Sequence, residues 1–260
     1  MESYRNFAVS LAREAGLLLK KRLHEIHTVD FKGEINIVTE ADLMSEELIL
    51  SRITARYPDH DILSEESPGT VKGSEYRWII DPLDGTTNYA HGYPVFSVSI
   101  ALEIGGEVCL GVVYNPMLGE MFVAEKGRGA FLNRRRLSVS IQDNLTRCLL
   151  ATGFPYDIRT NKNNNIKYFN RLVLSCQAVR RAGSAALDIA YVAAGRFDGF
   201  WELKLMPWDM AAGMLLVREA GGMVTDMEGQ PYSLTSPNVI ASNGIIHREM
   251  LGLFREVDAL

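Results

Sequence analysis

One short segment, residues 78–88, restricts the possible folds of this chain more than any other part of the sequence. It reads Trp-Ile-Ile-Asp-Pro-Leu-Asp-Gly-Thr-Thr-Asn, and its apolar beginning predicts the end of a buried strand. Asp81 and Asp84 then stand three positions apart around a proline. Hard carboxylate oxygens at a strand end suit Mg²⁺, which keeps coordination positions for water and a substrate phosphate.

The residues after the two aspartates are typical of an anion site. Gly85 lets the backbone approach an anion closely, because it has no side chain. A short helix beginning near Thr86 would direct its free N–H groups toward the same point, where phosphate binds well. The segment therefore predicts a site where Mg²⁺ and phosphate meet, although Asp-Pro and Asp-Gly pairs are also common in turns that bind no metal.

The composition is that of an ordinary globular protein with a sizeable core. The chain has 260 residues, enough for one or two domains, and 47% of them are hydrophobic and 23% charged. A formal net charge of -5 argues against a protein that binds nucleic acid through phosphate contacts.

The cysteine pattern bears on metal binding and location. Cys109, Cys148 and Cys176 form no CxxC pair, so we expect neither a zinc site nor a disulfide framework, and free thiols fit a reducing cytoplasm. We expect no membrane attachment, since no signal pattern or span-length apolar run is present.

The hydrophobic pattern changes character near residue 140. Residues 30–40 interrupt the pattern and predict a loop or hairpin. The predicted helices cover 4–25, 40–56, 165–175, 184–195, 209–220 and 246–256. The predicted strands cover 61–63, 95–103, 107–114, 120–124, 130–132, 149–152, 178–181, 198–201 and 223–225. We therefore predict an α+β subdomain, 1–140, with an antiparallel sheet and most metal ligands, and an α/β subdomain, 141–260, that completes the metal site and the substrate pocket.

Three further places carry carboxylates that could complete the site. Glu65 and Glu66 follow a predicted strand, so they either lie in a solvated loop or turn inward onto a metal, which would offset the cost of burying them. Asp209 stands at the start of a predicted helix, either as an N-cap alone or also as a metal ligand. The small residues 211–213 would let this helix pack closely against another backbone. Asp42 either favours the first turn of its own helix or lies beside the same site.

Together these segments resemble the inositol monophosphatases, within the lithium-sensitive, Mg²⁺-dependent phosphatase superfamily, essentially from end to end. Residues 81–88 resemble the first family signature, Asp-Pro-Leu-Asp-Gly-Thr-Thr-Asn. Residues 208–213 (Trp-Asp-Met-Ala-Ala-Gly), followed by 219–222 (Glu-Ala-Gly-Gly), resemble the second. The glutamate pair at 65–66 stands the expected short distance upstream. Three signatures in the right order are far more specific than one motif.

The resemblance implies the fold of the family. It predicts a layered α-β-α-β-α sandwich of the inositol monophosphatase and fructose bisphosphatase type, which combines α+β and α/β elements. The active site of such a fold lies between the two halves. The resemblance also implies a cytoplasmic homodimer.

The resemblance further implies that two or three Mg²⁺ ions bind in the site. The first would be held by Glu65, Asp81 and the backbone carbonyl of Leu83. The second would be held by Asp81, Asp84 and Asp209. Asp81 stands between the other ligands in sequence and could bridge two ions with its two oxygens, as in sites that clamp both oxygens of an in-line displacement.

A third, weaker ion would involve Glu65 and waters. Asp42 and Glu66 lie near its expected position. Lys32 and Asn36 fall in the segment that corresponds to the catalytic loop of the family. Asn36 stands where many relatives carry aspartate, and this departure affects how the third ion, rather than the first two, is held.

The family mechanism predicts direct attack of a metal-bound water on phosphorus, with no phosphoenzyme. Glu65 and the Thr86 hydroxyl would orient that water and accept its proton, and the shared ligand Asp81 completes the catalytic set. The backbone N–H groups of Gly85 and Thr86 would bind the phosphate. Glu202 and the residues Gly183, Ser184 and Ala185 match positions that contact inositol in the family.

Glu202 is the residue that bears most on the substrate. A carboxylate that accepts two ring hydroxyls is a natural reader of a polyol, although Glu202 could also be a surface strand residue. We predict a phosphatase, a hydrolase that releases inositol and phosphate from inositol 1-phosphate. The alternatives are a fructose-1,6-bisphosphatase or a nucleotide 3'-phosphatase of the same superfamily, or a non-catalytic regulatory protein that uses the fold to bind a partner.

Overall fold

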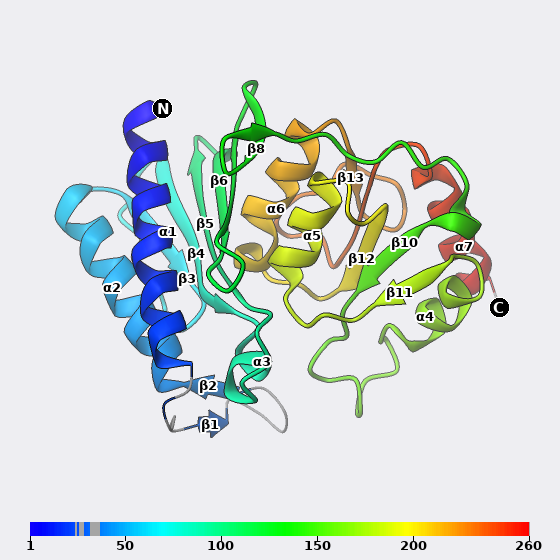
Figure 1. Ribbon diagram of the computed structural model, residues 1–260, viewed down its shortest axis with the longest axis horizontal. Helices are drawn as coiled ribbons and strands as arrows, with labels where there is room; N and C mark the ends of the chain where they lie inside the picture. The colour runs from blue at the N-terminus through cyan, green and yellow to red at the C-terminus, as the bar shows by residue number, and fades with distance from the viewer. Residues whose placement is uncertain (24, 26–28, 32–36, 260) are drawn as a thin grey trace.

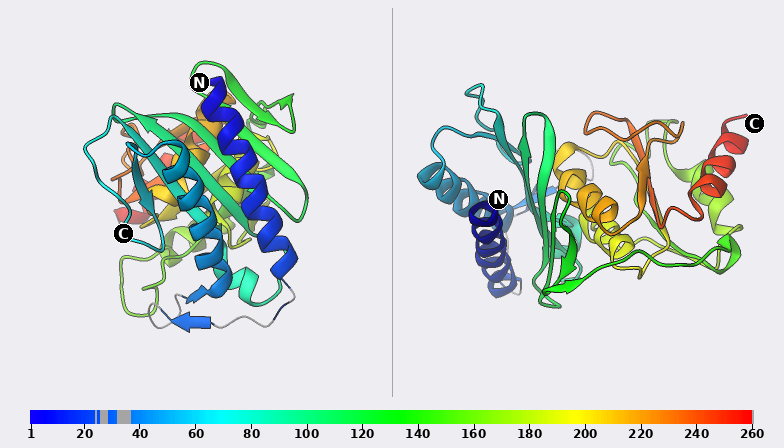
Figure 2. Two further views of the ribbon diagram at one scale, coloured as in Figure 1. Left: turned by 90° about the vertical axis from the view of Figure 1, so that its left-hand side faces the viewer. Right: turned by 90° about the horizontal axis from the view of Figure 1, so that it is seen from above.

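The chain folds into five alternating layers of helices and strands (Figure 1, Figure 2). The computed structural model describes residues 1–23, 25, 29–31 and 37–259. A seven-stranded and a five-stranded sheet alternate with three pairs of helices. The helix pairs are α1 (Glu2–Arg22) with α2 (Glu40–Arg56), α5 (Ala185–Ala193) with α6 (Pro207–Glu219), and α4 (Ile166–Val173) with α7 (His247–Asp258). This arrangement confirms the predicted α-β-α-β-α sandwich.

The seven-stranded sheet follows the chain in order from β3 to β9. Neighbouring strands are antiparallel except β3 and β4, which run parallel. The β5–β6 hairpin turns at Gly105 and Gly106, whose positive φ angles suit a two-residue turn that matches the twist of the strands. The strands are β3 (Asp61–Ser64), β4 (Tyr76–Asp84), β5 (Ser97–Ile104), β6 (Glu107–Asn115), β7 (Glu120–Glu125), β8 (Gly129–Leu132) and β9 (Arg135–Arg136).

The five-stranded sheet has the order β11-β10-β12-β14-β13 and mixes parallel with antiparallel pairs. Its strands are β10 (Leu149–Thr152), β11 (Ala178–Arg180), β12 (Gly199–Leu203), β13 (Met223–Thr225) and β14 (Asn238–Ser242). The sequence prediction lacks β14, because its short apolar run is flanked by polar residues. The remaining elements are β1 (Val29–Phe31), β2 (Ile37–Thr39), α3 (Thr86–Ala90) and a 3-10 turn (Leu145–Arg147). β1 and β2 pair antiparallel, as expected of the hairpin alternative for residues 30–40.

Three hydrophobic cores fill the spaces between the layers. One lies between α1, α2 and the seven-stranded sheet and includes Trp78 and Ile80. The second surrounds α5 and α6 between the two sheets and includes Ile79. The third lies beneath α4 and α7 and includes Trp201 and Phe254. The apolar run that precedes Asp81 is thus unbroken because both faces of β4 are covered, with alternate side chains entering different cores.

Helix α6 lies close to the seven-stranded sheet because the residues at the contact are small. A β-carbon on Gly111 of β6 would lie 2.7 Å from the carbonyl oxygen of Ala212 and 2.8 Å from its Cα. A β-carbon on Gly213 would lie 2.8 Å from the Ile189 side chain of α5. The close packing predicted for residues 211–213 is confirmed. Since α5 and α6 share one core with both sheets, the division into subdomains at residue 140 stays a prediction.

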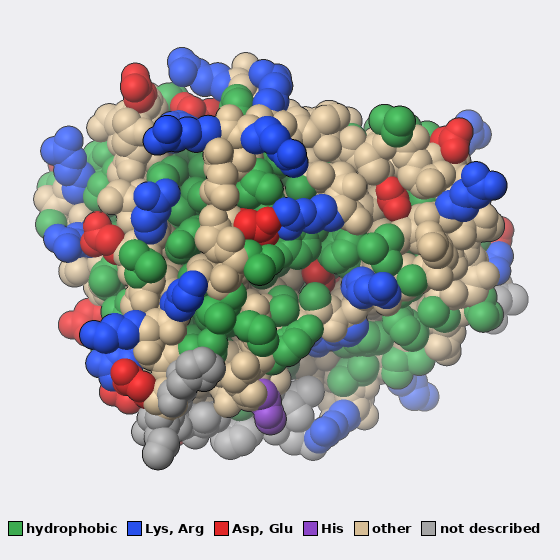
Figure 3. Space-filling view, viewed as in Figure 1, with side chains coloured by type: hydrophobic (Ala, Val, Ile, Leu, Met, Phe, Trp, Pro, Cys, Tyr) green, Lys and Arg blue, Asp and Glu red, His purple; other side chains and the backbone are tan. Residues whose placement is uncertain are grey.

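The surface carries charges of both signs. On the face in Figure 3, the lysine and arginine side chains are spread out rather than gathered into one continuous basic patch. Among the described helices, none combines the length and the apolar character that crossing a membrane requires.

Candidate active site

A bulge in β4 brings Asp81 and Asp84 to the same side of the sheet. Asp81 pairs with Ser99 of β5 and Asp84 pairs with Ser97, so three steps along β4 match two steps along β5. Without the bulge, residues three apart on a strand would point to opposite faces. Pro82 lies inside the bulge, where the missing N–H of proline disturbs the sheet least.

The Asp84 carboxylate joins the large sheet to helix α5. It accepts hydrogen bonds from the hydroxyls of Ser97, at 3.1 Å, and Ser184. It also accepts the backbone N–H groups of Ala185, at 3.2 Å, and Ala186, at 3.0 Å. Burial raises the pKa of Asp84, and these hydrogen bonds, led by that of Ser184, oppose the rise. Two residues predicted to contact substrate, Ser184 and Ala185, therefore also fix the orientation of Asp84.

Asp209 lies in the first turn of α6. The helix begins at Pro207, which suits a first helical position because its missing N–H would have no partner there. Asp209 is therefore the third helical residue, and the sequence prediction that it is the N-cap is wrong by three positions. Its Oδ2 accepts the backbone N–H of the actual N-cap, Met206, at 2.7 Å. The carboxylate thus closes the helix start and also reaches the site.

Asp42 is fully buried and orients Thr86. Its Oδ2 accepts the backbone N–H of Thr39 at 2.9 Å and the Thr39 hydroxyl at 2.5 Å, which caps α2. Its Oδ1 accepts the Thr86 hydroxyl at 2.8 Å, and the Leu83 carbonyl lies 3.1 Å from the same hydroxyl. Asp42 therefore fills the predicted helix role and also touches a residue predicted to be catalytic.

The glutamate pair sits at the end of β3, on a loop that a buried carboxylate organises. Glu46 of α2 is 6% exposed, and its Oε1 accepts the Ser64 hydroxyl at 2.5 Å and the Glu66 backbone N–H at 3.2 Å. Glu65 lines the same cavity as the aspartates, so the inward alternative holds for it. The sequence analysis missed Glu46, because a glutamate within Ser-Glu-Glu on a helix resembles a solvated residue.

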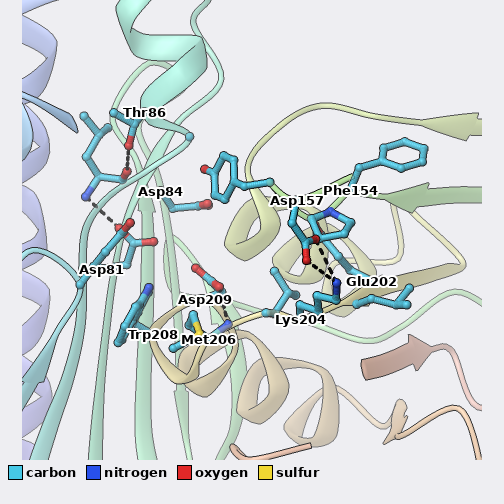
Figure 4. Close-up of a pocket in the computed structure, with 17 residues that line it drawn as sticks. Asp81, Asp84, Thr86, Phe154, Asp157, Glu202, Lys204, Met206, Trp208 and Asp209 are labelled. Carbon is cyan, nitrogen blue, oxygen red and sulfur yellow. Dashed lines mark hydrogen bonds and ion pairs between the residues drawn. The ribbon is translucent and has the colours of Figure 1, made fainter. Parts of the chain in front are cut away.

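Glu65 and the three aspartates of β4 and α6 line one cavity of about 380 Å³ at the end of β4, whereas Asp42 and Glu46 support it from behind its lining (Figure 4). Asp81, Asp84 and Asp209 lie around the same hollow, although they come from two distant segments of the chain. The predicted metal and phosphate residues that line the cavity are Glu65, Asp81, Leu83, Asp84, Gly85, Thr86 and Asp209. The structure therefore brings together residues that the sequence analysis assigned to one site.

The electrostatics of the cavity favour a cation. Burial raises the pKa of Asp81 well above its usual range, and the charges of Glu65, Asp84 and Asp209 add to the rise. Burial and the charge of Glu65 do the same for Asp209. An all-oxygen donor set of this kind matches the preference of Mg²⁺. Among the residues that the structure describes, no group of three or more acidic, histidine or cysteine side chains is already arranged to hold a metal ion.

A second cavity of about 600 Å³ adjoins the first. The four residues predicted to bind substrate line it: Gly183, Ser184, Ala185 and Glu202. Glu202 lies against Gly153, where a β-carbon would come within 2.3 Å of the carboxylate, so a larger residue at position 153 would displace this carboxylate. Burial raises the pKa of Glu202 to about 8, and the charge of Arg181 opposes the rise. Glu202 is 7% exposed, which contradicts the surface-residue alternative.

Several cavity residues were missed by the sequence analysis. Tyr156 lines both cavities, although more than half of its surface is exposed. Lys204 pairs with Asp157 at 2.7 Å at the edge of the first cavity (Figure 4). Neither belongs to a motif that predicts chemistry. Asp188 lines the second cavity and did have a signal, since it is the single charge in the apolar segment 185–193.

Two predicted residues cannot be placed. Lys32 and Asn36, which were assigned to the catalytic loop, lie outside the described residues. Glu66 is half-buried next to Glu65, and its assignment to a third ion stays a prediction.

Known proteins with similar sequences identify the family of this chain. A profile of the inositol monophosphatase family matches residues 1–259. The chain belongs to the inositol monophosphatase family. It is 44% identical to an inositol-1-monophosphatase of Mesorhizobium japonicum over 250 residues, covering 95% of this chain and 94% of the relative. It is 45% identical to the Nus factor SuhB of Escherichia coli K12 over 255 residues, covering 96% and 95%.

A solved structure agrees with the observed fold. The extragenic suppressor protein suhB of Bartonella henselae is 42% identical, with a TM-score of 0.93 over 98% of this chain and 99% of that one. Membership of the family confirms the predicted resemblance and identifies the chain as a phosphatase of a family that acts on small phosphate esters and is generally metal-dependent. The relatives carry two different names, so the substrate is a separate question.

Proposed function

We propose that this protein is a Mg²⁺-dependent phosphomonoesterase that hydrolyses inositol 1-phosphate to inositol and phosphate by direct attack of water. One observation carries the proposal: a cavity lined by Glu65, Asp81, Asp84 and Asp209 opens beside a cavity that holds the buried carboxylate of Glu202. The first suits a metal and a phosphate, and the second suits the hydroxyls of a polyol. A relative named inositol-1-monophosphatase, 44% identical, supports the same substrate.

The metal ligands follow from the side chains around the first cavity. Glu65, Asp81 and the Leu83 carbonyl would hold one Mg²⁺, and Asp81, Asp84 and Asp209 would hold the second. When bound, the ions would lower the pKa of a water and neutralise charge that develops on the phosphate. The raised pKa values of Asp81 and Asp209 support this assignment, because a cation would relieve the repulsion that causes part of the rise.

Thr86 is suited to orient the attacking water. Its hydroxyl has a single proton, which is directed at Asp42 or at the Leu83 carbonyl. The oxygen is therefore left to accept a hydrogen bond from water. Glu65 lines the same cavity and would take the proton that the water loses, while the N–H groups of Gly85 and Thr86 would bind the phosphate.

A second candidate function is regulation through a partner. It is favoured by relatives named Nus factor SuhB that are 45% identical to this chain. A protein that served only to bind a partner could lose its metal carboxylates freely, whereas this chain keeps all four together with Thr86. We therefore propose catalysis as the primary function, and a partner-binding role could exist beside it without altering the site.

Further properties follow from family resemblance and form part of the proposal. They are two or three Mg²⁺ ions in turnover, sensitivity to lithium and a homodimer, to which the free cysteines add a cytoplasmic location. The fructose-1,6-bisphosphatase and nucleotide 3'-phosphatase alternatives keep the metal site and change only the occupant of the second cavity.

The test is phosphate release with Mg²⁺ from inositol 1-phosphate, fructose 1,6-bisphosphate, adenosine 3',5'-bisphosphate and 2'-AMP. We expect a strong preference for inositol 1-phosphate. A preference for another compound would retain the metal chemistry and overturn the polyol assignment. Release from none of the four would favour the regulatory function.

A further inference from the structure

The second cavity contains a buried carboxylate that has no part in the proposed chemistry. Asp188 lies in the first turn of α5 and is 2% exposed. It lines the cavity of about 600 Å³ beside Glu202. Within the described part of the chain, its Oδ1 atom has no hydrogen-bond partner. A buried polar oxygen without a partner destabilises a folded protein, so its presence beside a cavity calls for a functional explanation.

Asp188 and Glu202 share one electrostatic environment. Burial and the charge of Asp84 raise the pKa of Asp188, and the charge of Arg181 opposes the rise. Glu202 responds to the same groups, and Asp188 is among the charges that raise its pKa. Two carboxylates from different elements, α5 and β12, therefore face one cavity with one guanidinium near both of them.

These two carboxyl groups and the guanidinium favour some phosphate esters over others as substrates. A ring with several hydroxyls can donate hydrogen bonds to both carboxyl groups, whose oxygens accept in the ionised and in the protonated form. A second phosphate group in the same cavity would instead meet a single cation, and it would be repelled by either carboxyl group that ionises. The cavity thus matches an uncharged polyol better than the distal half of a bisphosphate.

We propose that Asp188 is a second substrate-recognition residue, which acts with Glu202 to bind the hydroxyls of a polyol monophosphate and to exclude bisphosphates. This inference rests on the proposed phosphatase function and identifies the substrate class of the same site. It assigns Asp188 no part in the chemical step. Its contribution lies in binding and therefore concerns KM rather than turnover on a minimal substrate.

The experiment compares Asp188→Asn and Asp188→Ala with the wild-type protein on two substrates. Inositol 1-phosphate has ring hydroxyls, and p-nitrophenyl phosphate has none. We expect KM for inositol 1-phosphate to rise about tenfold, as for a lost buried hydrogen bond. We expect kcat/KM for p-nitrophenyl phosphate to stay within about threefold, and hydrolysis of fructose 1,6-bisphosphate relative to inositol 1-phosphate to increase.

Thermal unfolding separates this role from a structural one. Because Oδ1 of Asp188 has no hydrogen-bond partner among the described residues, we expect Asp188→Asn to melt at the same or a higher temperature than the wild type. Asp198→Asn is the matched control. Asp198 is also buried, but its carboxylate accepts the Ser140 hydroxyl at 2.5 Å and the Leu149 N–H at 2.7 Å, so we expect a lower melting temperature and no selective loss on either substrate.

Two results would overturn the assignment of Asp188. One is an unchanged KM for inositol 1-phosphate, and the other is an equal loss on both substrates together with a lower melting temperature. If the wild type hydrolyses p-nitrophenyl phosphate but no polyol phosphate, then the proposed substrate and the role of Asp188 both fail, whereas the phosphatase assignment stands. If the wild type hydrolyses inositol 1-phosphate and Asp188→Asn does so equally well, only the role of Asp188 fails.

Discussion

The Thr86 hydroxyl lies 2.8 Å from the Asp42 carboxylate, which is buried in the first turn of a different helix. The other oxygen of Asp42 is held by the N–H and the hydroxyl of Thr39. The capping group of α2 therefore also fixes the rotation of the Thr86 hydroxyl at the edge of the metal cavity. The Asp42 side chain thus caps a helix and also contacts a residue of the proposed catalytic site.

Thr86→Val tests whether this hydroxyl takes part in turnover. Valine keeps the shape and removes the oxygen that would accept a water hydrogen bond, so we expect kcat on inositol 1-phosphate to fall about 100-fold, within the range for a lost acid–base group. Thr86→Ser keeps the hydroxyl and should retain activity within about tenfold. Steady-state kinetics of both variants decide the matter, and equal activity of Thr86→Val and Thr86→Ser would contradict the role.

Asp209→Asn tests the metal site. Asparagine can still accept the Met206 N–H that Asp209 now accepts, so we expect little change in melting temperature. It removes one negative charge from the cavity, so we expect Mg²⁺-dependent turnover to fall below about 1% of the wild type. The same substitution at exposed Asp143 is the control and should leave activity unchanged. Activity like the wild type in Asp209→Asn would disprove the assignment of this ligand.

Gly85→Ala tests the phosphate loop. Gly85 has φ of +97°, and a β-carbon there would lie 3.0 Å from the Val95 carbonyl and 3.2 Å from the Gly183 carbonyl. We expect a loss of about 1–3 kcal/mol in the free energy of unfolding, together with a lower kcat/KM. Gly92→Ala is the matched control, since Gly92 has φ of +67° and, within the described part of the chain, no atom would lie within 4 Å of its β-carbon. Chemical denaturation should show the smaller loss for Gly92→Ala, and equal losses would mean that the contacts around Gly85 do not matter.

His247 predicts a pH dependence of stability. The ring is buried against the hydroxyls of Thr225 and Ser242, and burial lowers the pKa of His247 to about 4. The unfolded chain binds the proton with a pKa of about 6.5. The contribution of neutral His247 is therefore fully present above pH 6.5 and is lost as the pH falls from there toward 4.

The measurement is the melting temperature of the wild type and of His247→Gln between pH 7.5 and pH 4.5. We expect His247→Gln to be the less stable of the two at pH 7.5, because it loses the fit to both hydroxyls. The difference between the two proteins should shrink as the pH falls. Parallel curves would show that His247 does not titrate on unfolding.

Predictions of secondary structure from the sequence were most accurate where they depended on local chemistry alone. The apolar run at 78–80 and the helix predicted at 40–56 both depend on local chemistry, and each is observed where expected. The signature residues were grouped correctly because three motifs in order indicate a family. The bulge in β4 was not predicted, although it is what places Asp81 and Asp84 on one face.

The residues that the sequence did not predict depend on contacts between distant segments. Glu46 is buried only because the loop after β3 folds over it, and Tyr156 reaches both cavities only because its loop crosses them. The N-cap of α6 was misplaced because Asp209 does accept a capping hydrogen bond, but from three residues before it. Asp188 differs from these residues, because a single charge within an apolar helix is visible in the sequence.

The most direct test of the proposed function is the metal dependence of phosphate release from inositol 1-phosphate. The wild-type protein is freed of divalent ions with a chelator, assayed, and assayed again after Mg²⁺ is restored. We predict no turnover without Mg²⁺ and full recovery with it, while Asp209→Asn stays inactive in both conditions. Undiminished turnover after removal of the ions, or no turnover at any Mg²⁺ concentration, would contradict the proposal that these carboxylates form a Mg²⁺-dependent inositol phosphatase.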